Sequence, residues 1–196
     1  IEDRVELVAN YISNSGRKVF YCASINADPM YLLGRVYQVY ECGGNGIHVN
    51  FHAGLGCYKS IREQDLPMLL HFQKSGDKIL NFSQHNFHIN ETVIFDLVSK
   101  SGCGSLHCGM IGGYYGDQGN VLKTIEVLRA NNSISALSCG MKPSLIESIT
   151  QTIGHGDWMA NVGGALFSHK NGTLAGVKAM RQSVDKNYQQ EYFDSL

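Results

Sequence analysis

The chain has 196 residues, of which 43% are hydrophobic and 17% are charged, and its formal net charge at pH 7 is −1. This length and composition predict a soluble chain with one sizeable core, and the nearly neutral charge excludes a strong attraction to nucleic acid or to an anionic membrane surface. No apolar run approaches the roughly 20 residues of a membrane-spanning helix, so we expect a single domain with neither a nucleic-acid nor a membrane partner.

Helical and extended patterns alternate along the chain. Apolar residues at helical spacing, together with capping residues such as Asn90, predict helices, and short apolar runs predict strands. The predicted helices cover residues 5–13, 31–40, 58–64, 92–100, 121–130, 144–153 and 174–186. The predicted strands cover residues 18–25, 46–52, 67–72, 105–111, 134–138 and 159–163. The pattern therefore predicts an opening helix followed by six strand–helix units.

Regular alternation with short connections predicts parallel strands joined by crossover helices, in a (β/α) barrel or an open doubly wound sheet. A dinucleotide-binding sheet is disfavoured, because the glycine-rich residues 43–46 precede a strand where that motif should open a helix. A closed barrel needs about eight strands, so the barrel interpretation predicts about two further units upstream of Ile1.

Small residues follow three of the later strands. His107 lies within one of these strands, which is followed by a glycine-rich loop, while Gly140 follows the next strand and Gly163 and Gly164 follow the last. Backbone N–H groups that no side chain covers can bind an anion, and ligand sites in both candidate folds lie at the carboxyl ends of the strands. The sequence therefore predicts a phosphate-binding rim.

The six cysteines include no CxxC pair, and most lie in or beside apolar runs. We therefore expect reduced thiols and a cytoplasmic protein. Cys103, His107 and Cys108 come closest to a metal-binding cluster. Because side chains alternate along a strand, His107 and Cys108 should face opposite ways, which argues against a shared zinc ion.

Four segments occur in the order and approximate spacing of one protein family. These segments are residues 68–74 (MLLHFQK), residues 97–102 with 107–109 (LVSKSG and HCG), residues 138–140 (SCG) and residues 162–169 (VGGALFSH). In them the chain resembles the C-terminal barrel of the ribulose-bisphosphate carboxylase (RuBisCO) large chain. The resemblance implies an α/β fold of the (β/α)8 TIM-barrel family with about six strand–helix units present and the first two strands missing. It further implies that residues 1–196 form a single, partial barrel domain.

The resemblance also implies roles for matching residues. Lys74 stands where the family has an arginine that binds one substrate phosphate, and His107 matches a histidine at the same end. Ser138 matches a serine that contacts the sugar hydroxyls. Three glycines resemble the backbone clamp for the other phosphate, namely Gly140, Gly163 and Gly164. The implied ligand is a phosphorylated small molecule.

Two departures from the carboxylase pattern change the expected chemistry. Gln73 replaces an active-site histidine, and Tyr114 aligns with the lysine that stabilises the added CO2. No lysine lies between His107 and Lys123. Losing a cation aimed at developing charge removes several kcal/mol of transition-state stabilisation, so we expect no CO2 fixation. In this pattern the chain is similar to the RuBisCO-like (form IV) proteins. This resemblance implies enolisation, isomerisation or decarboxylation of a phosphorylated keto sugar or sugar acid.

Other implied parts of the enzyme lie outside this sequence. In the family, the Mg2+-binding segment follows the second barrel strand, and a further catalytic lysine lies on the first strand. Neither precedes Ile1, and the chain does not begin with Met, so we expect a longer parent chain. We expect Mg2+ to act in the intact enzyme, with no metal ligand and no main catalytic lysine among these residues. The resemblance also implies a homodimer.

Each candidate also has a structural interpretation. Lys74 suits a solvated strand end, Ser138 a turn, and His107 or His71 a hydrogen-bonded core position. The glycines at 163–164 suit close packing of a helix. Three hypotheses for function therefore stay open: a RuBisCO-like lyase or isomerase, an authentic carboxylase, and a non-catalytic barrel fragment.

Overall fold

The computed structural model describes residues 1–112 and 118–196. The chain divides into two compact units. The first unit contains Ile1–His107 and Val127–Ser133, and the second contains Cys108–Glu126 and Ile134–Leu196. Tyr114 lies outside the described residues.

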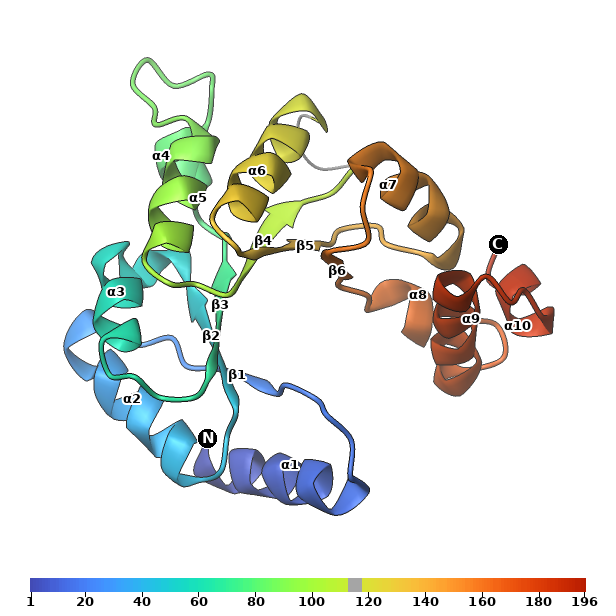
Figure 1. Cartoon of the computed structure of the whole chain (residues 1–196), viewed down its shortest axis with the longest axis horizontal. Helices are drawn as coiled ribbons and strands as arrows, with labels where there is room; N and C mark the ends of the chain where they lie inside the picture. Colours follow the sequence, from blue (N-terminus) through green and yellow to red (C-terminus); the bar gives the residue numbers. More distant parts are fainter. Residues whose placement is uncertain (113–117) are drawn as a thin grey trace. The chain divides into compact units, whose positions relative to one another are not determined.

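Strands and helices alternate through the described residues (Figure 1). The strands are β1 (Cys22–Ser24), β2 (Gly46–Asn50), β3 (Leu69–Gln73), β4 (Ser105–Gly109), β5 (Ile134–Leu137) and β6 (Trp158–Ala160). The α-helices are α1 (Glu2–Ser15), α2 (Pro29–Glu41), α3 (Gly56–Arg62), α4 (Lys78–Asn81), α5 (Glu91–Lys100), α6 (Gln118–Ala130), α7 (Ile146–Ile153), α8 (Gly164–Phe167), α9 (Thr173–Asp185) and α10 (Gln190–Phe193). Two 3-10 helices, η1 (Phe51–Ala53) and η2 (Pro143–Leu145), complete the set. The prediction of an opening helix and six strand–helix units is confirmed.

The first unit is built on parallel strands in register. In β2 and β3, His48 lies opposite His71, and in β3 and β4 the same His71 lies opposite Ser105. Because side chains alternate along a strand, these three residues share one face of the sheet, and Gln73 and His107 share that face with them. Every one of these side chains is polar, so this face differs from an ordinary apolar core face.

The opposite face of the same strands carries the core of the first unit. Phe72 of β3 is fully buried, and its ring lies 5.5 Å from that of Tyr58 in α3 and 5.4 Å from that of Phe95 in α5, both edge to face. Edge-to-face aromatic pairs at this distance add to the stabilisation that burial alone provides. These ring contacts hold helices α3 and α5 against the apolar face of the sheet (Figure 1).

The second unit continues the parallel arrangement. Strand β5 pairs with β6, with Ala136 opposite Met159, and the N–H of Ser138 donates to the carbonyl of Gly109 at the end of β4 over 2.9 Å. Helices α8 and α9 pack closely, because a Cβ at Gly176 would lie 2.6 Å from the carbonyl oxygen of Leu166. Only a glycine fits there without displacing backbone.

Several predicted boundaries are wrong by a few residues. The predicted strand 46–52 ends at Asn50, because the Asn50 side chain accepts a hydrogen bond from the N–H of His52 and starts η1. The predicted helix 144–153 begins as η2, and the predicted strand 159–163 is replaced by the shorter β6. The four-residue helices α4, α8 and α10 were not predicted, since one turn is too short to show a helical period.

Among the described residues, no helix has both the length and the apolar character that a membrane span requires.

Candidate functional site

The polar face of the first unit gathers three histidines. The rings of His48 and His71 have centroids 5.2 Å apart, and Nδ1 of His71 lies 2.5 Å from the Ser105 hydroxyl. His107 Nδ1 lies 3.2 Å from Oε1 of Gln73. Since a carbonyl oxygen only accepts, Gln73 selects the His107 tautomer with the proton on Nδ1.

Burial keeps these histidines uncharged at neutral pH. The pKa of His71 is lowered to about 4, chiefly by burial and then by the nearby His48 and His107. Burial also lowers the pKa of His107 to about 4, with the Lys74 ammonium as the next cause. The pKa of His48 is lowered by burial as well. His107 therefore offers hydrogen bonds to a ligand near pH 7 but brings no positive charge.

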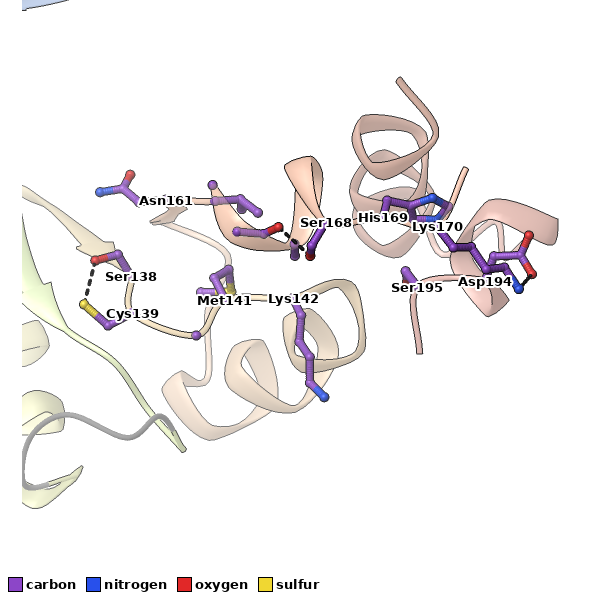
Figure 2. A pocket seen from close by; sticks show the side chains of 15 residues that line it. Ser138, Cys139, Met141, Lys142, Asn161, Ser168, His169, Lys170, Asp194 and Ser195 are labelled. Carbon is purple, nitrogen blue, oxygen red and sulfur yellow. Dashed lines mark hydrogen bonds and ion pairs between the residues drawn. The ribbon is translucent and has the colours of Figure 1, made fainter. Parts of the chain in front are cut away.

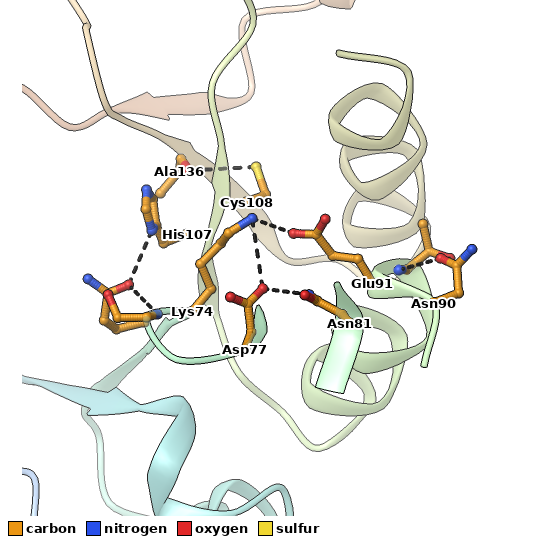
Figure 3. A network of polar contacts seen from close by, with 11 residues as sticks. Lys74, Asp77, Asn81, Asn90, Glu91, His107, Cys108 and Ala136 are labelled. Carbon is orange, nitrogen blue, oxygen red and sulfur yellow. Dashed lines mark hydrogen bonds and ion pairs between the residues drawn. The ribbon is translucent and has the colours of Figure 1, made fainter. Parts of the chain in front are cut away.

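Lys74 lies in an ion-pair network at the carboxyl end of β3 (Figure 3). Its Nζ forms an ion pair with Glu91, the first residue of α5, and lies 4.0 Å from Oδ2 of Asp77. The Asn81 side-chain amide donates to the same Asp77 oxygen over 2.6 Å. The side chains of Lys74, Glu91 and Asp77 are only 17%, 12% and 4% exposed. Lys74 is therefore an enclosed, ion-paired cation and not a solvated strand end.

The second unit contains a cavity of about 780 Å³ at the carboxyl ends of β5 and β6. Ser138 and Gly140 line it from the loop after β5, and Gly163 and Gly164 line it from the loop after β6. Figure 2 shows Ser138 and Cys139 at one side of this cavity and Lys170 with Asp194 at the other. Four of the predicted site residues are thus brought together around one space.

The backbone of both loops is accessible to a ligand. The chain turns after β5 through two left-handed residues, Cys139 at φ 76° and Gly140 at φ 110°. No atom lies within 4 Å of the place where a Cβ would stand on Gly163 or on Gly164. Close packing of a helix therefore does not explain these two glycines, because no neighbouring atom lies close enough to them. At the start of α8, the N–H groups of Leu166 and Phe167 donate to the carbonyl of Gly163 over 3.0 and 3.2 Å, so Gly164 and Ala165 are the residues of this turn whose N–H groups a ligand would use.

Several residues of the cavity were not predicted from the sequence. Lys142 and Asn161 line it, and Lys170 forms an ion pair with Asp194 over 2.6 Å at its edge. His169 is buried there, with Nε2 3.0 Å from the carbonyl of Glu191. Lys142 follows the glycine turn after Ser138 by only a few positions, which is the one signal that the sequence offered for it.

The predicted site residues therefore fall into two groups. Lys74 and His107 lie in the first unit, and Ser138 lies with the three glycines in the second. Tyr114, at the predicted lid position, is not among the described residues.

The described residues offer no fitting site for the Mg2+ that the resemblance implies. Within residues 1–112 and 118–196, no three His, Cys, Asp or Glu side chains are grouped so that they could hold a metal ion. Asp77 and Glu91 are close to one another, but both are engaged by Lys74.

Comparison with known proteins gives the fold a family context. No protein-family model matches the sequence. Similar curated proteins include the ribulose bisphosphate carboxylase of Thermococcus kodakarensis, 25% identical over 94% of this chain and 48% of the relative. The carboxylase of Methanocaldococcus jannaschii is 22% identical over 94% and 49%, and the RuBisCO-like protein of Archaeoglobus fulgidus is 23% identical over 94% and 45%. The chain spans about half the length of the curated relatives it matches.

Solved structures give the same picture at higher coverage of this chain. The archaeal RuBisCO of Pyrococcus horikoshii superposes with a TM-score of 0.87, at 20% identity over 99% of this chain and 51% of the other. The chain resembles the C-terminal barrel portion of the RuBisCO large-chain family. A RuBisCO-like protein from Burkholderia fungorum has a TM-score of 0.84 at 18% identity, covering 99% and 54% of the two chains. The predicted fold class, a partial barrel of the TIM-barrel family, is thereby confirmed. The RuBisCO fold explains why the loops after β5 and β6 meet at one cavity, since ligand sites of such barrels lie at the carboxyl ends of the strands.

Proposed function

We propose that this chain is part of a RuBisCO-like enzyme that acts on a phosphorylated keto sugar or sugar acid by enolisation, isomerisation or decarboxylation, without fixing CO2. The observation that carries this proposal is the cavity of the second unit, where Ser138 and the glycines of two strand ends surround one space. Similarity to RuBisCO-like proteins from Archaeoglobus fulgidus and Burkholderia fungorum supports it.

In the second unit, backbone N–H groups bind the phosphate. Gly140, Gly163 and Gly164 allow the phosphate to approach the backbone closely, because none carries a side chain that would stand between them. The ammonium of Lys142, on the same cavity, adds a charge-assisted hydrogen bond, and the Ser138 hydroxyl contacts a sugar hydroxyl.

The first unit offers a second set of candidate ligand groups on its polar face. Neutral His107, with its tautomer set by Gln73, offers hydrogen bonds to hydroxyl groups, and Lys74 offers its ammonium to an anionic group. Because the amide of Gln73 does not titrate, it orients a ligand but does not exchange a proton. The described residues therefore contribute binding and orientation. They do not form a fitting Mg2+ site, so no chemical step is assigned to that ion.

The assembly and location of the protein are proposals of the same kind. We propose a homodimer, because the similar archaeal RuBisCO from Hyperthermus butylicus, which superposes with a TM-score of 0.83, is dimeric. No disulfide links the cysteines of the described residues, and we propose a reducing, cytoplasmic compartment.

Calorimetry on the full chain tests the ligand class. Ribulose 5-phosphate should bind at least about tenfold more tightly than ribulose, because a charge-assisted hydrogen bond contributes roughly 1.5–3 kcal/mol. Equal affinities for the two sugars would exclude a phosphate site and with it the proposed function.

Authentic carboxylase activity is the second candidate. The names of seven similar curated relatives, among them those from Thermococcus kodakarensis and Rhodobacter capsulatus, support it. The absence of a lysine between His107 and Lys123 argues against it. Incorporation of 14CO2 into product by the full-length protein would select this candidate over the first.

A further inference from the structure

The first unit surrounds one cation with two carboxylates. Lys74 Nζ forms an ion pair with Glu91 and lies 4.0 Å from Asp77. The same ammonium lies over the ring of Phe95, with Nζ 5.8 Å from the ring centroid. Glu91, Asp77 and Phe95 therefore enclose the ammonium on several sides.

The charges of this cluster do not balance. One ammonium faces two carboxylates, and all three side chains are mostly buried, so their interactions are screened less than at a surface. An anionic ligand group that approaches Lys74 meets two negative charges as well as the positive one. It also competes with Glu91, to which the ammonium donates a hydrogen bond.

Glu91 and Asp77 differ in how firmly they are held. Asp77 is 4% exposed and accepts a second hydrogen bond from Asn81, so it is fixed beneath Lys74. Glu91 is the first residue of α5 and follows residues 82–90, every one of which is exposed. Glu91 is thus the less firmly held of the two carboxylates that compete with an incoming anion for Lys74.

We propose that Glu91 is a specificity-determining residue, which competes with an anionic group of the ligand for Lys74 and so disfavours ligands that carry negative charge at this end. This inference rests on the proposed function, because it assumes that the polar face of the first unit contacts the ligand. The opposite role for Glu91 would be to position Lys74 for binding an anion. The two roles predict opposite effects of removing the carboxylate.

The test compares three probes on the full chain by calorimetry: ribulose 1,5-bisphosphate, ribulose 5-phosphate and inorganic phosphate. Glu91→Gln keeps the size of the side chain and removes its charge. It should raise the affinity for the bisphosphate and for inorganic phosphate by about tenfold, since a charge-assisted acceptor no longer competes. The preference for the bisphosphate over the monophosphate should rise with it.

Two further variants separate local competition from a general change of charge. Glu63→Gln removes a carboxylate from an exposed pair with Lys59 in the same unit, whose side chains are 61% and 73% exposed, and should leave all affinities unchanged. Lys74→Met should abolish the gain when it is combined with Glu91→Gln. Should Glu91→Gln fail to fold by circular dichroism, Glu91→Ala provides the same loss of charge.

The outcomes distinguish this inference from the proposed function. Unchanged or weaker binding of both the bisphosphate and inorganic phosphate by Glu91→Gln overturns the role of Glu91. A gain that persists without Lys74 also overturns it. A Lys74-dependent gain for inorganic phosphate, in a protein that binds neither sugar, would retain the role of Glu91 and reject the proposed function.

Discussion

The two units differ in the kind of chemical group that they offer to a ligand. In the first unit the groups are ionisable side chains, and their charge depends on the residues packed around them: His107 is neutral because it is buried, and Lys74 is paired with Glu91. In the second unit the groups are mainly backbone N–H groups at Gly163 and Gly164, where nothing crowds the missing side chain. Backbone N–H groups remain hydrogen-bond donors as long as the loops keep their conformation. The charge of an ionisable side chain, in contrast, depends on the residues packed around it.

The largest effect should come from the core of the first unit. Phe72→Ala removes a fully buried ring that packs against three others, so the free energy of unfolding of this unit should fall by about 3–5 kcal/mol. Urea unfolding followed by circular dichroism measures the loss, while fluorescence of Trp158, the single tryptophan, reports on the second unit. We expect the circular dichroism signal to change before the fluorescence does.

The matched control is Phe87→Ala, because Phe87 is 94% exposed and its removal should change stability by less than about 0.5 kcal/mol. Coincident transitions by both probes in Phe72→Ala would show that the two units unfold as one, and the comparison between them would lose its basis.

The second-largest effect should come from acid, which should lower the free energy of unfolding of the first unit. His71 and His107 have pKa values of about 4 when folded, below the ordinary value of 6.5. Between these values the unfolded chain binds more protons than the folded chain, so stability falls as the pH drops from about 6.5 towards 4 and is retained above that range. The loss should be on the order of 3 kcal/mol for each of the two histidines, measured by urea unfolding at several pH values.

A matched pair of substitutions identifies the source of this pH dependence. His107→Gln removes a buried titrating ring and should flatten the curve, whereas His85→Gln changes an exposed residue of the same unit and should leave it alone. A pH dependence of equal steepness in both variants would contradict the assignment to the buried histidines.

The smallest effect on stability is expected from a substitution at the cavity of the second unit. The same substitution should clearly lower ligand affinity. Gly164→Ala has open space for its methyl group and lies at the start of α8, where alanine suits a helix better than glycine by about 1 kcal/mol. Stability should therefore be unchanged or slightly higher. Affinity for ribulose 5-phosphate should fall about tenfold, because the methyl group blocks close approach to the backbone.

Gly34→Ala provides the comparison for that variant. Gly34 lies within α2 of the first unit and also has no atom within 4 Å of an added Cβ, so this change should raise stability without altering ligand affinity. An equal affinity loss in both variants, or none in Gly164→Ala, would remove the glycines from the proposed phosphate site.

Much of the fold was predictable because strand–helix alternation is a local property. The N-cap at Asn90 was predicted correctly, and its side chain accepts from the N–H of Thr92 over 2.9 Å. The strand that was predicted at 18–25 is instead only β1, Cys22–Ser24. Such boundaries depend on where a neighbouring strand stops pairing, which a single segment does not encode.

The candidate site was predictable only in part. The glycines and Ser138 follow strand ends, and parallel strands bring their carboxyl ends to one edge, so their grouping at one cavity follows from the topology. Lys170 follows α8 closely, whereas Asp194 reaches the cavity only because α9 and α10 return the chain to it. No local sequence pattern predicts the pairing of these two residues.

The sequence alone determined the order of strands and helices, the polar and apolar faces of the strands and the positions of the glycine turns, because each of these depends on residues close together in the chain. Only the tertiary structure decided that Lys74 is paired with Glu91 and that His107 is neutral. Burial and charge pairing depend on which distant residues become neighbours, and the electrostatic energy of a side chain is set by those neighbours more than by its own chemistry.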